Sequence, residues 1–198
     1  MNDPKEALEA ARLIDRLERL SRSPDARTGL NPAQWEALRY AARANRFSRS
    51  PAALADYLGS TRGTVSQTLI ALEDKGLIAR QQNPKDRRSL ELVVTDAGHA
   101  MLAGDPLIDL ARDIAAGSGD DVSALVDLLR ATLRQTIRRN GGKSFGACRT
   151  CRHFQRNAVR SSTMPHRCGL LNEPLSDADG SAICAEHEEA GDRTGCRP

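Results

Sequence analysis

Aromatic side chains make up only 3% of the 198 residues, and no cysteine occurs before residue 148. So few rings disfavour single-stranded nucleic acid as a partner, because such strands are usually held by base stacking on aromatic side chains. No stretch approaches the roughly 18 apolar residues of a membrane span. The start of the chain also lacks the apolar segment of a secretory signal. We therefore expect a cytoplasmic protein with no membrane partner.

Motifs of the common enzyme classes are also missing. The sequence has no Gly-rich phosphate loop, no Gly-x-Ser-x-Gly elbow and no His-Glu-x-x-His zinc motif. Its four histidines are scattered at positions 99, 153, 166 and 187. We therefore expect a protein that is not an enzyme. A metal-dependent enzyme built on the C-terminal cysteines is the less favoured alternative, since four thiolates would leave the metal no open coordination position.

Residues 50–76 carry the pattern of two short helices joined by a tight turn. A Ser-Pro pair at the start can cap and open the first helix. Gly59 permits the left-handed turn that ends it. Either Ser60 or Thr61 can cap the second helix, and Gly76 can end it. This pattern predicts a helix-turn-helix, in which the second helix enters the major groove of duplex DNA.

The first two turns of the second helix hold short polar side chains on the face opposite its apolar repeat. When such a helix enters the major groove with its N-terminus first, this face meets base edges and phosphates. The contacts predicted from this helix are Thr61, Arg62, Thr64, Ser66 and Gln67.

Two strand-like segments follow, residues 77–80 and 90–94, joined by a basic loop. They predict a hairpin, or wing, beside the helix-turn-helix. A basic tip fits a narrow minor groove, whose negative potential attracts arginine. A solvated surface loop is the alternative interpretation of this tip. The contacts predicted from the hairpin are Arg80, Lys85, Arg87 and Arg88.

Amphipathic helices are predicted on both flanks of this region. Residues 5–22 and 121–139 carry apolar stripes at helical spacing, and a third helical stretch begins at Thr95 and is interrupted at residues 104–106. A monomer could fold these stripes back on itself. A homodimer is favoured, because a palindromic site is read by two copies of the DNA-binding unit.

These motifs, in this order, resemble the MarR (multiple-antibiotic-resistance regulator) family. Residues 30–35 are similar to the start of the family's preceding helix, 61–66 to its recognition helix and 72–78 to the exit from that helix. Residues 86–88 and 92–98 resemble its wing and next helix. The resemblance implies a dimeric transcription regulator, usually a repressor, that binds a double-stranded DNA operator. It also implies a DNA affinity that changes with a small ligand or with oxidation.

The predicted fold class is mainly α with a small β-wing. A winged helix-turn-helix and dimerisation helices from both ends form one domain at 1–140, with the reading head at about 30–98. A small Cys-rich C-terminal module follows at 141–198, after an Asn-Gly-Gly break.

The C-terminal module departs from the family pattern in its cysteines. Cys148 and Cys151 form a C-x2-C pair, and Cys168 and Cys184 follow. In a reducing compartment, four thiols of this spacing favour one metal centre over structural disulfides. Zinc is favoured because a bound zinc ion would stabilise the fold of so small a module, and an iron–sulfur cluster is the alternative. Free or disulfide-paired thiols are the competing interpretation.

Other residues of the module are left open. His166 and His187 lie near cysteines and are possible substitute ligands, while Cys196 is left out of the site. The signal is either a small molecule bound between the dimerisation helices and the reading head or the metal or redox state of the module. Relatives that sense peroxide through a first-helix thiol need a cysteine there, and residues 5–22 have none. A further alternative is a DNA-bound adaptor whose zinc-stabilised module recruits a protein partner.

Overall fold

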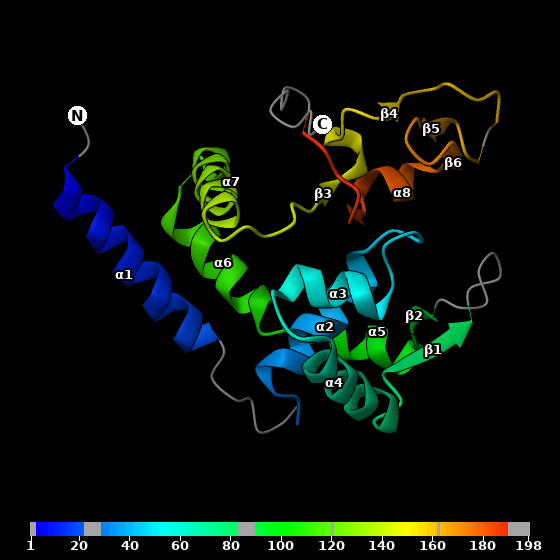
Figure 1. Cartoon of the computed structure of the whole chain (residues 1–198). Coiled ribbons are helices and arrows are strands. Elements are labelled where there is room, and N and C mark those ends of the chain that lie inside the picture. Colours follow the sequence, from blue (N-terminus) through cyan, green and yellow to red (C-terminus); the bar gives the residue numbers. More distant parts are fainter. Residues whose placement is uncertain (1–2, 22–28, 83–89, 120, 162, 190–198) are drawn as a thin grey trace.

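The computed structural model describes residues 3–21, 29–82, 90–119, 121–161 and 163–189 (Figure 1). Its α-helices are α1 Pro4–Ser21, α2 Pro32–Arg43, α3 Pro51–Leu58, α4 Arg62–Asp74, α5 Asp96–Ala103, α6 Leu107–Gly117, α7 Val122–Arg139 and α8 Asp177–Ser181. Its strands are β1 Ile78–Gln82, β2 Leu90–Val94, β3 Gly146–Ala147, β4 Phe154–Gln155, β5 His166–Cys168, β6 Glu173–Leu175 and β7 Ile183–Cys184. None of these helices is long and apolar enough to cross a membrane.

Helices α2 to α5 and the β1–β2 hairpin form the head, and their limits follow local sequence signals. Ser50 caps α3 by accepting a hydrogen bond from the Ala53 amide, and Thr61 caps α4. Gly59 ends α3 with φ 58°, in the left-handed region that glycine adopts readily. The predicted helix-turn-helix is therefore present, with Thr61 rather than Ser60 as the cap.

The core of the head lies between α2, α3, α4 and the base of the hairpin. Leu38, Leu54, Leu72 and Leu92 are completely buried in it. Strands β1 and β2 pair antiparallel, from Ile78 opposite Val94 to Gln82 opposite Leu90, so the hairpin extends from this core as a wing. Burial of so many leucines is the main driving force for folding of the head.

Helix α5 lies very close to the start of the wing. The Thr95 hydroxyl donates a hydrogen bond to the Gly76 carbonyl at 2.7 Å. A Cβ at Gly98 would lie 2.2 Å from the Leu77 carbonyl oxygen and 2.7 Å from a Val94 methyl carbon. The close approach of α5 to this turn therefore requires glycine at position 98.

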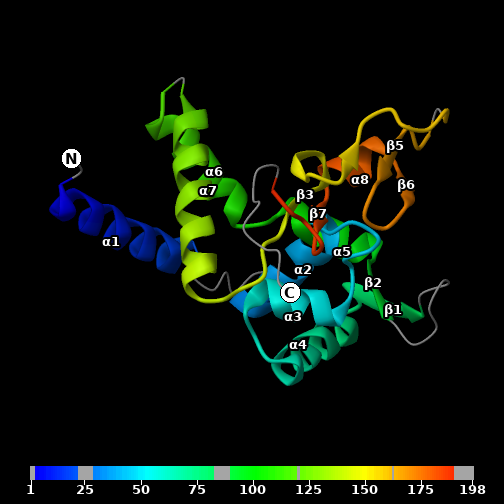
Figure 2. The same ribbon diagram turned by 45° about the horizontal axis from the view of Figure 1, so that its top comes forward.

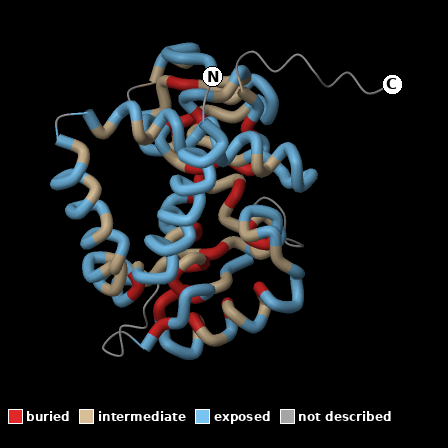
Figure 3. Tube along the Cα trace, turned by 90° about the vertical axis from the view of Figure 1, so that its left-hand side faces the viewer, coloured by how far each residue is buried: buried red, intermediate tan, exposed pale blue. Residues whose placement is uncertain are grey.

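Helices α1, α6 and α7 extend from the head as an arm (Figures 1 and 2). None of their residues is buried, and Figure 3 colours their described residues as exposed or intermediate. Several large apolar side chains face solvent along this arm, among them Leu13 (52% exposed), Leu17 (46%), Leu128 (65%) and Leu133 (59%). The predicted amphipathic helices are thus present, with apolar faces that this single chain does not cover.

The C-terminal residues 143–189 form small sheets that dock on the head. Strand β3 pairs with β7, and β4, β5 and β6 form a three-stranded antiparallel sheet. The connection from α2 to α3 contacts β7 directly, since the Asn45 amide donates to the Ile183 carbonyl at 2.8 Å. Ile183 is buried and belongs to the core of the head. The C-terminal module therefore packs on the head.

Candidate functional site

The predicted DNA-contacting residues of the recognition helix lie on one side of α4. Val65, Leu69 and Leu72 are buried on the other side and fix the helix to the core. The structure leaves Thr61, Arg62, Thr64 and Gln67 exposed and Ser66 half-buried. Thr61 also accepts a hydrogen bond from the Thr64 amide at 3.2 Å, so its side chain is engaged in capping. The predicted contact residues therefore lie on an exposed or half-buried polar face, and their contact with DNA stays a prediction.

Arg80 in the wing has a protein partner that the sequence analysis did not consider. Its guanidinium donates a hydrogen bond from Nε to the Glu73 carboxylate at 2.8 Å, and its backbone amide donates to the same side chain at 3.0 Å. The hydrogen bond from Arg80 lowers the pKa of Glu73. Arg80 thus ties β1 to the end of α4, and its contact with DNA stays a prediction. Lys85, Arg87 and Arg88 lie outside the described residues.

An apolar cavity of about 390 Å³ lies between the arm and the head. It is lined by α1, α2, α6 and α7, with Trp35 and Arg39 on the α2 side. The Arg39 guanidinium lies 5.3 Å from the centroid of the Trp35 ring and donates to Asp105 at 2.7 Å. Burial raises the pKa of Asp105, but the hydrogen bonds from Arg39 and the Leu107 amide outweigh it and lower that pKa. The lining is therefore mainly apolar, and its charged residues are Glu18, Glu36 and Arg39, the last of which pairs with Asp105.

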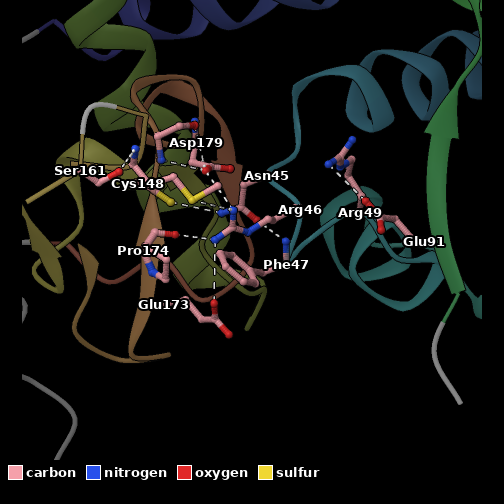
Figure 4. A network of polar contacts seen from close by, with 12 residues as sticks. Asn45, Arg46, Phe47, Arg49, Glu91, Cys148, Ser161, Glu173, Pro174 and Asp179 are labelled. Carbon is pink, nitrogen blue, oxygen red and sulfur yellow. Dashed lines mark hydrogen bonds and ion pairs between the residues drawn. The ribbon is translucent and has the colours of Figure 1, made fainter. Parts of the chain in front are cut away.

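Two of the four predicted metal ligands lie side by side against the head. Cys148 and Cys184 are both buried, and each shifts the pKa of the other. Asn45 Nδ2 donates to Cys148 Sγ at 3.2 Å (Figure 4). The hydrogen bond from Cys148 lowers the pKa of Cys184 to about 6, while the shared proton and burial raise that of Cys148.

The other two cysteines have separate surroundings. Cys151 Sγ accepts a hydrogen bond from the Glu188 amide at 3.5 Å. Cys168 lies on β5, opposite Phe154, and its Sγ accepts from the Leu171 amide at 3.4 Å. Within the described ranges, no three or more His, Cys, Asp and Glu side chains are grouped so that they could hold a metal ion. The metal centre on the four thiols therefore stays a prediction.

The two histidines near the cysteines differ in their contacts. His166 is buried, and its Nε2 lies 3.0 Å from an Asp177 carboxylate oxygen while its Nδ1 accepts from the Asn157 amide. His187 Nε2 lies 2.9 Å from the Thr150 hydroxyl, and burial lowers the pKa of His187. Its Nδ1 is buried without a hydrogen-bond partner among the described residues. Cys196 lies outside the described residues.

The docking contacts of the module centre on Arg46, which the sequence analysis did not single out. The Arg46 guanidinium donates to the Pro174 carbonyl and lies 3.6 Å from Asp179 and 4.0 Å from Glu173 (Figure 4). It also lies over the Phe47 ring, 4.6 Å from its centroid. No local pattern signals this role, because all three carbonyl or carboxylate partners lie more than 120 residues away in the sequence.

Comparisons with known proteins agree with this architecture. Residues 28–89 match the profile of the MarR family. CouR from Rhodococcus jostii RHA1, solved with p-coumaroyl-CoA, is 19% identical over 67% of this chain and 92% of its own, with a TM-score of 0.54. BldR from Sulfolobus solfataricus is 23% identical over 68% and 99%, with a TM-score of 0.52. A MarR family regulator from Rhodococcus sp. RHA1 is 17% identical over 69% and 96%, with a TM-score of 0.51. The search among curated proteins gave no match.

The head and its wing define a winged helix-turn-helix protein. Its residues 28–89 match the MarR family profile, and solved structures of MarR family transcription regulators share its fold. The expectation of a regulator rather than an enzyme agrees with this family.

Proposed function

We propose that this protein is a homodimeric repressor that binds a palindromic operator in double-stranded DNA. The observation that carries the proposal is the exposed polar face of α4, fixed by three buried apolar residues on its other side. The experiment is selection of binding sites from a random duplex pool with the full-length protein. A consensus with two related half-sites about one helical turn apart supports the proposal. Recovery of no consensus contradicts it.

Gln67→Ala and Arg62→Ala are expected to reduce discrimination between the selected operator and random DNA by about 1–3 kcal/mol each. Both side chains are exposed on the groove-facing side of α4, so their loss removes base-edge contacts without disturbing the core. Fluorescence anisotropy at two salt concentrations measures the change. Arg112→Ala removes a similar charge from the exposed surface of α6 and serves as the control. Equal losses on both DNAs for Gln67→Ala would show that the wrong helix face was chosen.

The cavity between the arm and the head is proposed to bind an apolar small-molecule effector. Its volume of about 390 Å³ lies within the range of ligand sites. CouR, which shares the fold, was solved with p-coumaroyl-CoA bound.

Trp35 is the only tryptophan of the chain and lines this cavity, so its fluorescence reports on occupancy. Titration with a panel of neutral aromatic compounds is expected to quench this fluorescence and to lower operator affinity at the same concentrations. Leu110→Phe narrows the cavity without adding a second tryptophan and is expected to weaken both effects, because Leu110 also lines it. Quenching that persists unchanged in Leu110→Phe would place the ligand elsewhere.

A metal centre on Cys148, Cys151, Cys168 and Cys184 is kept as a separate proposal. Amide donors to Cys151 and Cys168 support it, because such hydrogen bonds favour thiolates. Bound zinc would stabilise the fold of the module, whereas an iron–sulfur cluster would make the module a sensor of redox state. Zinc, iron and acid-labile sulfide per subunit, measured in protein purified without oxygen or chelator, decide between the two. Absence of all three contradicts the proposal.

If no metal is found, the alternative is that the module recruits a protein partner. Deletion of residues 141–198 is then expected to abolish binding of that partner.

A further inference from the structure

A very short segment leads from the end of α7 in the arm to β3 (Figure 2). The amides of Gly141 and Gly142 donate to carbonyls near the end of α7 at 3.3 and 3.0 Å, and Gly141 has φ 64°. These are the hydrogen bonds of a Schellman cap, so the chain is fixed to α7 as far as Gly142. Two residues then separate this cap from Phe145. Since each residue spans at most about 3.6 Å, the cap lies within about 11 Å of Phe145.

Phe145 is anchored on the head. Its ring packs edge-to-face on Tyr57 of α3, with the centroids 5.2 Å apart, and on Tyr40 of α2 at 6.3 Å. Strand β3 begins at the next residue, and its Ala147 pairs with Ile183 of β7, which is buried in the core of the head. The ring and the strand that follows it therefore hold this point of the chain on the head.

The C-terminal module contacts the same segment and the arm. Ser144 Oγ donates to the His187 carbonyl at 3.2 Å, and the Arg134 guanidinium of α7 lies 3.3 Å from the Glu189 carboxylate. The ion pair is exposed, so it contributes little by itself. The short path from α7 to Phe145 is therefore the main restraint on this side of the arm.

The arm is also joined to the head at the start of α6. Arg39 of α2 donates from Nε to the Asp105 carboxylate at 2.7 Å, and that carboxylate accepts from the Leu107 amide at 2.8 Å. This ion pair links α2 to the connection between α5 and α6. The arm thus meets the head before α6 and again after α7. Two attachments at different places restrict the rotation that one attachment would allow.

We propose that residues 143–145 are a tether that fixes the angle between the arm and the head, so that the dimer accepts one spacing of operator half-sites. This inference rests on the proposed function, a homodimer on a palindromic operator. In such a dimer the arms join the two copies, and α4 of each head reads one half-site. The distance between the two α4 helices then depends on the angle between arm and head. A short tether therefore makes the half-site spacing part of the sequence specificity.

The experiment lengthens the tether without removing any side chain. Insertion of Gly-Ser-Gly-Ser between Gly142 and Lys143 of the full-length protein lets the end of α7 move up to about 14 Å farther from Phe145. Anisotropy measures the Kd for the selected operator and for versions whose half-sites lie two base pairs closer together or farther apart. Wild-type protein is expected to lose about 100-fold in affinity at the altered spacings, because its two heads cannot bind together. The insertion variant is expected to lose less than about tenfold.

The same four residues added after Pro198 serve as the control and are expected to leave the spacing preference as in the wild type. Circular dichroism and sedimentation equilibrium check that each variant is folded and dimeric. Phe145→Ala keeps the length of the tether but removes its ring contacts with the head, so it is expected to broaden the spacing preference as well. If the insertion variant does not fold, Phe145→Ala decides the outcome.

Two results overturn the inference: a lengthened tether that leaves spacing discrimination as strong as in the wild type, or wild-type protein that binds all spacings equally well. If wild-type protein selects no operator, the proposed function fails by itself. The tether is then judged by small-angle X-ray scattering of the protein without DNA. The insertion is expected to increase the radius of gyration relative to the C-terminal control, and an unchanged radius overturns the inference.

Discussion

The double substitution Leu13→Glu and Leu133→Glu is expected to convert the protein to monomers and to weaken binding to a palindromic operator by about 100-fold or more. Leu13 on α1 and Leu133 on α7 are 52% and 59% exposed, and neither lines the cavity or the core. In a dimer, these side chains would meet the corresponding helices of a second copy. A buried, unpaired carboxylate at such an interface is strongly unfavourable.

Sedimentation equilibrium measures the dimer, and anisotropy measures operator binding. Leu170→Glu serves as the control, because Leu170 is also exposed, at 46%, but lies in the C-terminal module. Circular dichroism checks that the helices persist. A variant that remains dimeric, or wild-type protein that is monomeric at micromolar concentration, would refute the proposed interface.

Gly98→Ala is expected to lower the free energy of unfolding by about 1–3 kcal/mol, because the added methyl group overpacks a rigid site. Its Cβ would lie 2.2 Å from the Leu77 carbonyl oxygen, and a backbone atom cannot rotate away as the end of a side chain can. Relief requires α5 to move away from the wing, which would also disturb the contact between Thr95 and Gly76. Urea unfolding followed by circular dichroism measures this loss.

Gly117→Ala is the matched control for this substitution. Gly117 also lies in a helix, but among the described residues no atom beyond its chain neighbours and its own helix backbone lies within 4 Å of the Cβ that alanine would add. Alanine there is expected to be neutral or to stabilise by up to about 1 kcal/mol. Equal stability of the two variants would show that α5 lies farther from the wing than described.

Much of the α4 face proposed to bind DNA could be predicted from the sequence because its signals are local. Thr61 accepts from an amide three residues on, and the apolar repeat of α4 recurs within one helix. The residues that line the cavity could not be predicted from such local signals. Trp35 and Leu110 lie on different helices, and their helical periodicity alone does not distinguish a cavity wall from a packed core.

The sequence by itself determined the Ser50 cap, the Gly59 turn, the wing strands and the apolar stripes of the arm, because each depends on residues close together in the chain. Only the tertiary structure decided that Asn45 contacts Cys148, 103 residues away, and that the amide of Ala185 meets the Ser48 hydroxyl across 137 residues. Such contacts leave no periodic signal. They arise because burial of Ile183 in the head brings the module and the α2–α3 connection together.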